Sequence, residues 1–361
     1  MSHSLPRTPL VDALKALASQ FIVLHHLAAY GPMSEFGSEH AAGLFDWLYC
    51  NARMAVQVFF VVGGFLAART LAPKGVAAFS SPSAVLWRRY CRLAVPYIAA
   101  ILLSIAVAGV TRDWMDHDFV PAAPTLAQFA AHAVLLHDIL RFESLSAGVW
   151  YVAIDFQLFA LLVAVLCLGR IAHGTKPAMQ WAIPLLVLGL AIASLFYFNR
   201  DPDWDACALY FMASYGLGIL AYWTVNRTLS PFWLVVLVVL AVLSVAMDFR
   251  PRLLVALTAA LVLAMASGTR TFEHWRPAPW LSFLGRISYS VFLVHFPVCI
   301  LVNAVVFRYF QADPAANIVG LLVAWASSIS AGWLLYEMVE RRTMRVTGTD
   351  RSRSGTAAAP L

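Results

Sequence analysis

The sequence predicts an all-α polytopic membrane protein, a bundle of about ten transmembrane helices with both termini in the cytoplasm. The first observation is composition: 61% of the 361 residues are hydrophobic and only 12% are charged, whereas soluble domains are roughly 45–50% apolar and 25% charged. The second is that apolar runs of about 18–20 residues, each long enough to cross a bilayer as a helix, recur along the chain. The third is an asymmetric distribution of basic residues.

Ten segments have the length and hydropathy of a membrane-spanning helix. In chain order they are residues 10–30, 53–71, 91–110, 148–168, 179–198, 206–224, 231–247, 252–267, 284–307 and 316–338. Lys and Arg collect in cytoplasmic loops, and a cytoplasmic N-terminus puts 18 of the 25 Lys and Arg residues on that side. The other 7 are Arg53, Arg112, Arg141, Arg200, Arg250, Arg252 and Arg308.

The segment between the third and fourth spans is assigned differently. Residues 123–140 are apolar but contain His132 and His137. An eleventh span here would invert the downstream charge asymmetry, so we predict an interfacial or re-entrant helix on the outer side. We expect one transmembrane domain over residues 1–345, followed by a disordered cytoplasmic tail over the small, polar residues 346–361.

The first span carries polar groups that lipid disfavours. At 100° per residue, Lys15 and His26 lie within about 20° of each other, separated by roughly 16 Å along the helix axis. Asp12 and Ser19 share this face, whereas His25 lies about 80° away. An ionisable residue inside a span is a functional hypothesis by default. We therefore predict a functional role for His26, and for Asp12 a local pairing with Lys15.

Two other spans carry polar groups at comparable depth. Asp155 and Gln157 lie in the fourth span, where a carboxylate could fix the tautomer of His26 and stabilise its protonated form. The alternative is a structural polar contact between helices. In the ninth span, Ser288 and Tyr289 mark the cytoplasmic entry and His295 lies near the middle. Helix capping and interface anchoring are the alternatives for Ser288 and Tyr289.

A basic cluster flanks the loop between the second and third spans. Its members are Arg69, Arg88, Arg89 and Arg92. Four guanidinium groups around one cytoplasmic loop could bind phosphate groups, which Arg contacts in a bidentate manner. The alternative is that they only anchor the two helix ends at the membrane surface.

Six segments, in this order, resemble the acyltransferase-3 family of integral membrane O-acyltransferases. They are "VDALKALASQFIVLHHLA", "VFFVVGGFLAART", "RRYCRLAVPY", "VWYVAIDFQLF", "LGRISYSVFLVHFPV" and "YEMVERRTMR", which together extend over about residues 8–345. The chain departs from the family pattern at four positions. Lys15 stands in place of Arg, Gly63 in place of Ser, Asp155 in place of Glu and Arg342 in place of Pro.

The resemblance implies transfer of an acetyl group from cytoplasmic acetyl-CoA to a hydroxyl of a sugar, a cell-envelope polysaccharide or a lipid-linked glycan. It implies a multi-pass protein of the bacterial inner membrane, with acyl-CoA, a glycan acceptor and the bilayer as partners and without a metal or nucleic acid. The expected donor-binding residues are Lys15, Arg69, Arg88, Arg89, Arg92 and Arg286.

His26 would act as the general base or as the acyl carrier, Asp155 would orient it, and Tyr289 or His295 would stabilise the oxyanion. The remaining polar candidates are Ser19, His25, Trp150, Gln157 and Ser288.

Other functions are compatible with part of this pattern. The donor could be succinyl-CoA, or the acceptor a small molecule. A proton-coupled transporter would also distribute His, Asp and Arg through its spans. Transporters commonly consist of two related halves, and no such internal repeat is visible in this sequence.

Overall fold

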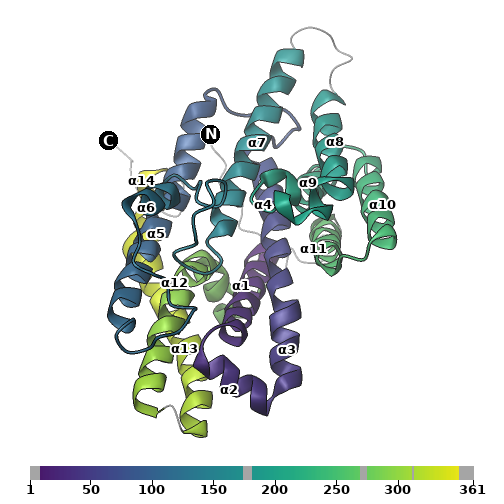
Figure 1. The fold of residues 1–361 in the computed structure, drawn as a ribbon. Coiled ribbons are helices and arrows are strands. Elements are labelled where there is room, and N and C mark those ends of the chain that lie inside the picture. Colours follow the sequence, from purple (N-terminus) through teal and green to yellow (C-terminus); the bar gives the residue numbers. More distant parts are fainter. Residues whose placement is uncertain (1–8, 174–180, 269–274, 311–312, 349–361) are drawn as a thin grey trace, which may run out of the picture.

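The apolar segments form helices that pack into one elongated bundle (Figure 1). The computed structural model describes residues 9–173, 181–268, 275–310 and 313–348 and contains no strand among them. Of the predicted tail over residues 346–361, Val346 is the last residue of a helix, and residues 349–361 lie outside the described residues. The helices are, in chain order, α1 (Pro9–Ala29), α2 (Pro32–His40), α3 (Ala42–Asn51), η1 (Ala52–Ala55), α4 (Val56–Leu71), α5 (Pro82–Thr111), α6 (Leu126–Ala133), α7 (Trp150–His173), α8 (Ala182–Phe196), η3 (Phe198–Arg200), η4 (Pro202–Trp204), α9 (Ala208–Val225), α10 (Phe232–Met247), α11 (Pro251–Gly268), α12 (Pro279–Phe310), α13 (Pro314–Leu335), η5 (Tyr336–Glu340) and α14 (Arg341–Val346).

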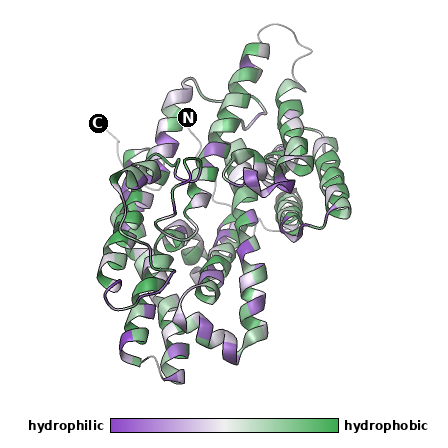
Figure 2. Cartoon of the chain, viewed as in Figure 1, coloured by the Kyte–Doolittle hydropathy of each residue, from purple (hydrophilic) through white to green (hydrophobic). Residues whose placement is uncertain are grey.

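The all-helical membrane architecture is confirmed. Within the described ranges, eight helical stretches are long and apolar enough to cross a membrane. The other two apolar helices, Phe232–Met247 and Pro251–Ala266, coincide with predicted spans but are shorter. Hydrophobic residues dominate α8, α10 and α11 (Figure 2). The number of spans and the side of the termini remain predictions.

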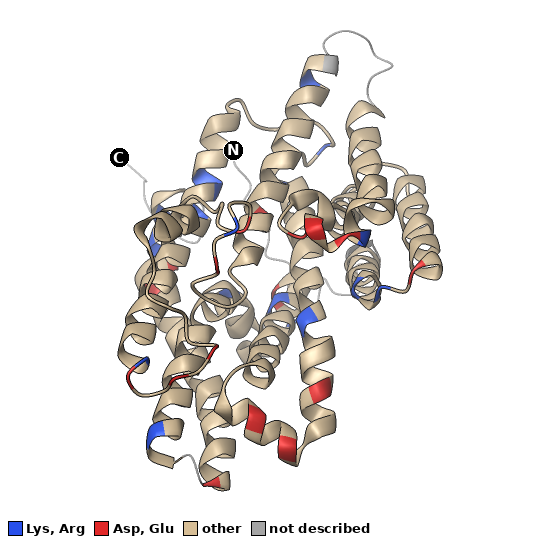
Figure 3. Ribbon diagram, in the orientation of Figure 1, with Lys and Arg blue, Asp and Glu red and all other residues tan. Residues whose placement is uncertain are grey.

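Two predicted boundaries were wrong because polar residues interrupt the hydropathy signal. The second span begins earlier, since α3, η1 and α4 form one stretch over Ala42–Leu71. The third begins at Pro82, where Ser81 accepts a hydrogen bond from the Ala84 N–H as the N-cap of α5. Arg88, Arg89 and Arg92 therefore lie on the helix itself rather than around a loop. Acidic residues gather on α2 and α3 (Figure 3).

Residues 123–140 do not form a span, because α6 is only 8 residues long. Thr125 and Gln128 form a capping box at its start. The segment runs back along α5: the Arg112 side chain donates to the Pro121 carbonyl, and the Tyr90 hydroxyl donates to the Ala133 carbonyl. Arg112 and Tyr90 are about 33 Å apart along α5, so the segment follows most of that helix, and its placement relative to the membrane stays a prediction.

Glycines allow two pairs of helices to approach closely. A Cβ atom on Gly64 would lie 2.0 Å from the Tyr215 carbonyl oxygen, and one on Gly218 would lie 1.9 Å from the Val61 carbonyl oxygen, between α4 and α9. A Cβ on Gly285 of α12 would lie 2.1 Å from the Asp12 carbonyl oxygen of α1. This last contact brings α1 and α12 together along their length.

We expect Gly218→Ala to destabilise the protein by about 1–3 kcal/mol, because the added methyl group overlaps backbone atoms that cannot move independently. Gly189→Ala is the matched control on α8, where an added Cβ meets nothing within 4 Å. That substitution should stabilise the helix by up to about 1 kcal/mol. Melting temperatures in one detergent compare the two, and equal values would contradict the close packing of α4 and α9.

Candidate functional site

A pair of buried histidines lies between α1 and α12. The His26 Nδ1 and His295 Nε2 atoms are 2.6 Å apart, and the two rings stack with centroids 4.7 Å apart. His295 Nδ1 lies 2.6 Å from the carbonyl oxygen of Phe292, one turn earlier on α12. His26 keeps 7% of its surface exposed and His295 only 1%. The two side chains were predicted to belong to one site, but their direct contact was not.

This geometry assigns the protons of the neutral pair. A carbonyl oxygen can only accept a hydrogen bond, so His295 Nδ1 carries a proton and donates it to Phe292. His295 Nε2 is then an acceptor, and His26 Nδ1 donates to it. The nitrogen lone pair that accepts no hydrogen bond within the histidine pair is therefore the one on His26 Nε2. The described residues supply no hydrogen-bond partner for this atom. Such a nitrogen can take a proton or an acyl group.

The loop before α7 approaches one edge of the His26 ring. A Cβ atom on Gly148, just before α7, would lie 3.3 Å from His26 Cε1 and 3.2 Å from the Phe292 ring. Gly148 has φ +77°, a conformation that L side chains rarely adopt. His25 points elsewhere: its Nδ1 lies 3.4 Å from the Leu48 carbonyl oxygen of α3.

Asp155 does not contact His26, and the predicted orienting role is wrong in this structure. Its Oδ2 instead accepts a hydrogen bond from Arg89 Nη2 at 2.5 Å. The Asp155 side chain is 3% exposed, and the Arg89 guanidinium also lies over the Phe159 ring at 5.0 Å. The position of α7 explains the difference, because this helix begins inside the bundle and packs against α5 (Figure 1). Asp155, five residues into α7, therefore reaches the arginine-bearing part of α5.

A second buried carboxylate lies near the Arg89–Asp155 pair. Glu340, buried in the π-helical turn η5, accepts a hydrogen bond from the Ser290 hydroxyl at 2.6 Å. Glu340 lies within electrostatic range of Lys15 and Arg92. We call Lys15, Arg89, Arg92, Asp155 and Glu340 the buried ionic cluster; it joins α1, α5, α7 and η5 and contains three cations and two carboxylates. The sequence comparison identified the segment that contains Glu340, but predicted no role for it.

Tyr289 belongs to this layer rather than to the histidine pair. Its hydroxyl donates to the Leu93 carbonyl at 2.9 Å. His295 lies six residues farther along α12, which is about 9 Å of helix rise. Tyr151, Phe59 and Phe292 pack between the two layers, with Tyr151 5.4 Å from Phe292 and 5.6 Å from Phe59 between ring centroids.

The other predicted site residues lie outside the cluster or have local structural partners. Arg88 and Arg286 are exposed, and Arg69 is half-buried at the end of α4. The Ser19 and Ser288 hydroxyls donate to the Ala16 and Gly285 carbonyls of their own helices. Gln157 accepts a hydrogen bond from the Ala208 N–H, so it connects α7 to α9. Trp150 stacks on Phe211 with centroids 5.5 Å apart.

The fold and the site define a polytopic α-helical membrane protein with a histidine pair and a cluster of ionisable groups between its helices. Residues 9–337 match the acyltransferase-3 family model, described as an acyltransferase domain. The chain therefore belongs to the acyltransferase-3 family of integral membrane O-acyltransferases.

A protein of Bacillus subtilis (strain 168), named "Putative peptidoglycan O-acetyltransferase YrhL", is 23% identical to this chain over 332 residues. The match covers 81% of this chain and 49% of the relative, so the chain spans about half the length of that protein. No solved structure matches the chain.

Proposed function

We propose that the chain is an acyl-CoA-dependent O-acyltransferase of a bacterial inner membrane that moves an acetyl group to a hydroxyl of a cell-envelope glycan. The observation that carries the proposal is the unengaged Nε2 of His26, held in one tautomer by His295 and the Phe292 carbonyl. Membership of the family supports the reaction class. The name of the Bacillus relative supports a peptidoglycan-like acceptor.

The buried ionic cluster supports an anionic donor. Its three cations exceed its two carboxylates, and Arg89 Nε is buried without a hydrogen-bond partner among the described residues. An unused donor of this kind is suited to a phosphate or carbonyl oxygen. Lys15 and His26 share one face of α1 about 16 Å apart along the axis, a separation that a pantetheine arm can bridge. Arg88 precedes Arg89 on α5, and Arg286 lies three residues before Tyr289 on α12. Both side chains would contribute further positive charge near the buried ionic cluster.

The chemistry follows from the free imidazole nitrogen. His26 Nε2 takes the proton of the acceptor hydroxyl while the hydroxyl oxygen attacks the thioester carbonyl. The carbon–sulfur bond then breaks, and the proton passes from His26 to the leaving thiolate, giving an ester and free CoA. In the other route, Nε2 itself attacks the thioester carbonyl, the carbon–sulfur bond breaks, and the Nδ1 proton of the acylated ring passes to the thiolate, which gives an acyl-imidazole and free CoA. The acceptor hydroxyl then attacks the acyl carbon, the carbon–nitrogen bond breaks, and the hydroxyl proton returns to the imidazole. His295 keeps Nε2 unprotonated in the resting state of both routes.

Donor binding is expected to raise the melting temperature of the purified protein in detergent, with acetyl-CoA, succinyl-CoA and free CoA compared at equal concentrations. A ligand at 100 times its dissociation constant stabilises the folded state by about 3 kcal/mol. Arg92→Ala should weaken binding about tenfold or more, because it removes a charged hydrogen-bond donor. Lys74→Ala, an exposed residue of the loop after α4, is the matched control.

The outcome separates the candidate functions. A saturable, acyl-dependent shift that Arg92→Ala weakens and Lys74→Ala leaves intact supports the acyl-CoA donor and identifies its acyl group. A folded protein that responds to none of the three compounds would contradict the proposal and favour the transporter.

A further inference from the structure

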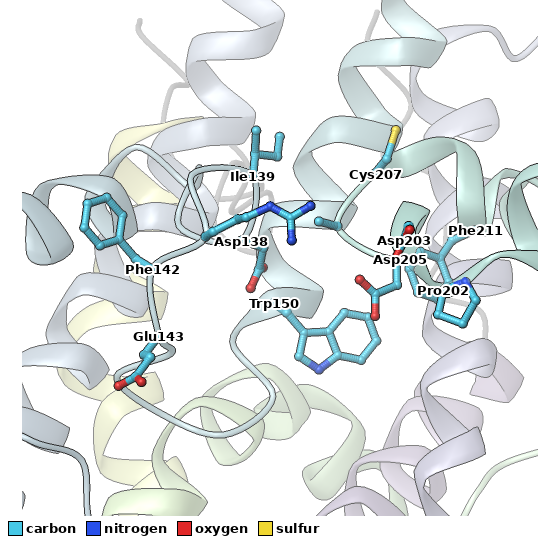
Figure 4. A pocket seen from close by; sticks show the side chains of 12 residues that line it. Asp138, Ile139, Phe142, Glu143, Trp150, Pro202, Asp203, Asp205, Cys207 and Phe211 are labelled. Carbon is cyan, nitrogen blue, oxygen red and sulfur yellow. The ribbon is translucent and has the colours of Figure 1, made fainter.

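A cleft of about 720 Å³ opens beside the start of α7. The loop over residues 138–143 forms one wall, and residues 202–207 with the start of α9 form the other (Figure 4). Neither loop figured among the sequence-predicted site residues. Only Trp150, at the base of the cleft, was a candidate.

The walls of the cleft are strongly acidic. Asp138, Glu143, Asp203 and Asp205 line it, together with the single basic side chain of Arg141. Burial, and secondarily the nearby Asp205 carboxylate, raise the pKa of Asp138 to about 6. Asp138 Oδ2 is buried, lies 3.2 Å from His137 Nε2 and accepts no hydrogen bond within the described residues. The carboxylates therefore present hydrogen-bond acceptors and repel an anionic ligand.

An aromatic surface accompanies the carboxylates. The Trp150 indole projects into the cleft (Figure 4) and is held by stacking on Phe211, with an interplanar angle of 25°. A fixed indole face packs against apolar C–H groups at little conformational cost. A pyranose ring has hydroxyl groups at its edge and C–H groups on its face. The carboxylates can accept hydrogen bonds from the hydroxyls, and the indole can pack against the C–H groups.

The cleft lies near the histidine pair along the chain, although neither histidine lines it. A Cβ atom on Gly148 would lie 3.3 Å from His26 Cε1, and Trp150, which lines the cleft, is two residues farther along. Two residues of extended chain cover at most about 7 Å. The backbone of Trp150 therefore lies within about 7 Å of the segment that packs against His26.

We propose that this cleft binds the acceptor and takes a sugar unit without negative charge, either neutral or an amino sugar. The inference rests on the proposed function, because it assigns the cleft to the acceptor of that reaction. It also narrows the acceptor class, since uronate-rich or phosphate-rich glycans would meet an excess of carboxylates.

The test measures direct binding of three tetrasaccharides to the purified protein by calorimetry: a glucosamine tetramer, an N-acetylglucosamine tetramer and a galacturonate tetramer. We expect the first two to bind and the third to bind at least about tenfold more weakly. The double substitution Asp203→Lys and Glu143→Lys, at two exposed positions, should shift the preference toward galacturonate by about tenfold. Glu39→Lys, an exposed carboxylate of α2 outside the cleft, is the matched control and should change nothing.

The aromatic surface is tested separately. Trp150→Ala should weaken binding of the N-acetylglucosamine tetramer about tenfold or more, and Trp150→Phe should restore part of it. No binding of any tetramer, or equal effects of the cleft and control substitutions, would overturn the assignment. Acyl-CoA melting shifts on the same preparation keep the two proposals distinguishable. Donor binding without tetramer binding rejects the cleft alone, and tetramer binding without donor binding rejects only the acyl-CoA reaction.

Discussion

Replacing His26 with Ala is expected to lower the rate of acyl transfer by about 10²- to 10⁴-fold, the range that a positioned general base contributes. Donor affinity should change little, because the buried ionic cluster lies about 16 Å away along α1. Transfer of labelled acetyl groups, with the acetyl-CoA melting shift measured on the same preparation, separates these two effects. Loss of both together would indicate a role in folding rather than in catalysis.

His25→Ala is the matched control for this experiment. The two histidines are adjacent, but His25 faces the Leu48 carbonyl of α3, whereas His26 contacts His295. We expect His25→Ala to keep most of the transfer activity. Wild-type activity in His26→Ala, or equal losses in the two variants, would contradict the assignment of His26.

The same preparations distinguish the two chemical routes. If His26 carries the acyl group, the wild-type protein should exchange labelled CoA into acetyl-CoA without any acceptor, because formation of the acyl-imidazole is reversible. If His26 acts only as a base, exchange should be absent while transfer to the acceptor proceeds. In the first case, His26→Ala should abolish this exchange. In the second case, neither the wild type nor His26→Ala should show exchange.

Hydropathy predicted most of the fold because a bilayer requires long apolar helices whose backbone groups are satisfied internally. It failed where polar side chains occur within a helix. The first turns of α5 contain Arg88 and Arg89, so the predicted span starts at residue 91 although the helix begins at Pro82. The path of residues 123–140 along α5 depends on specific contacts, such as Tyr90 with Ala133, that no periodicity encodes.

The candidate site was predictable in the same partial way. The 3.6-residue period correctly placed Lys15 and His26 on one face of α1, because helix geometry is local. The partner of His26 depends on how α1 packs against α12, which the close contact at Gly285 determines. Similar depth in the membrane suggested Asp155 as that partner. Depth was misjudged, however, because α7 starts inside the bundle, and Asp155 contacts Arg89 instead.

Removing the Asp155 carboxylate is expected to destabilise the protein by about 3–5 kcal/mol, the effect of leaving a buried charge without its partner. In the wild-type protein the Asp155 side chain is 3% exposed and the Arg89 side chain 22% exposed. In Asp155→Asn the Arg89 guanidinium would remain in this site without its partner charge. Arg89→Met removes the other charge, and the double variant removes both. We expect each single variant to melt well below the wild type and the double variant to recover much of the loss, since an apolar replacement of similar volume often tolerates burial better than a lone charge.

The pair Glu337–Arg341 provides the matched comparison on the exposed helix end, because both side chains are more than one third exposed. Glu337→Gln should change stability by no more than about 0.5 kcal/mol. If the double variant regains stability but not acetyl-CoA binding, the buried pair is retained for the donor rather than for folding. If it regains both, Arg89 does not contact the donor, and Lys15 and Arg92 alone would have to hold its phosphates. An unchanged melting temperature in Asp155→Asn would contradict the buried ion pair itself.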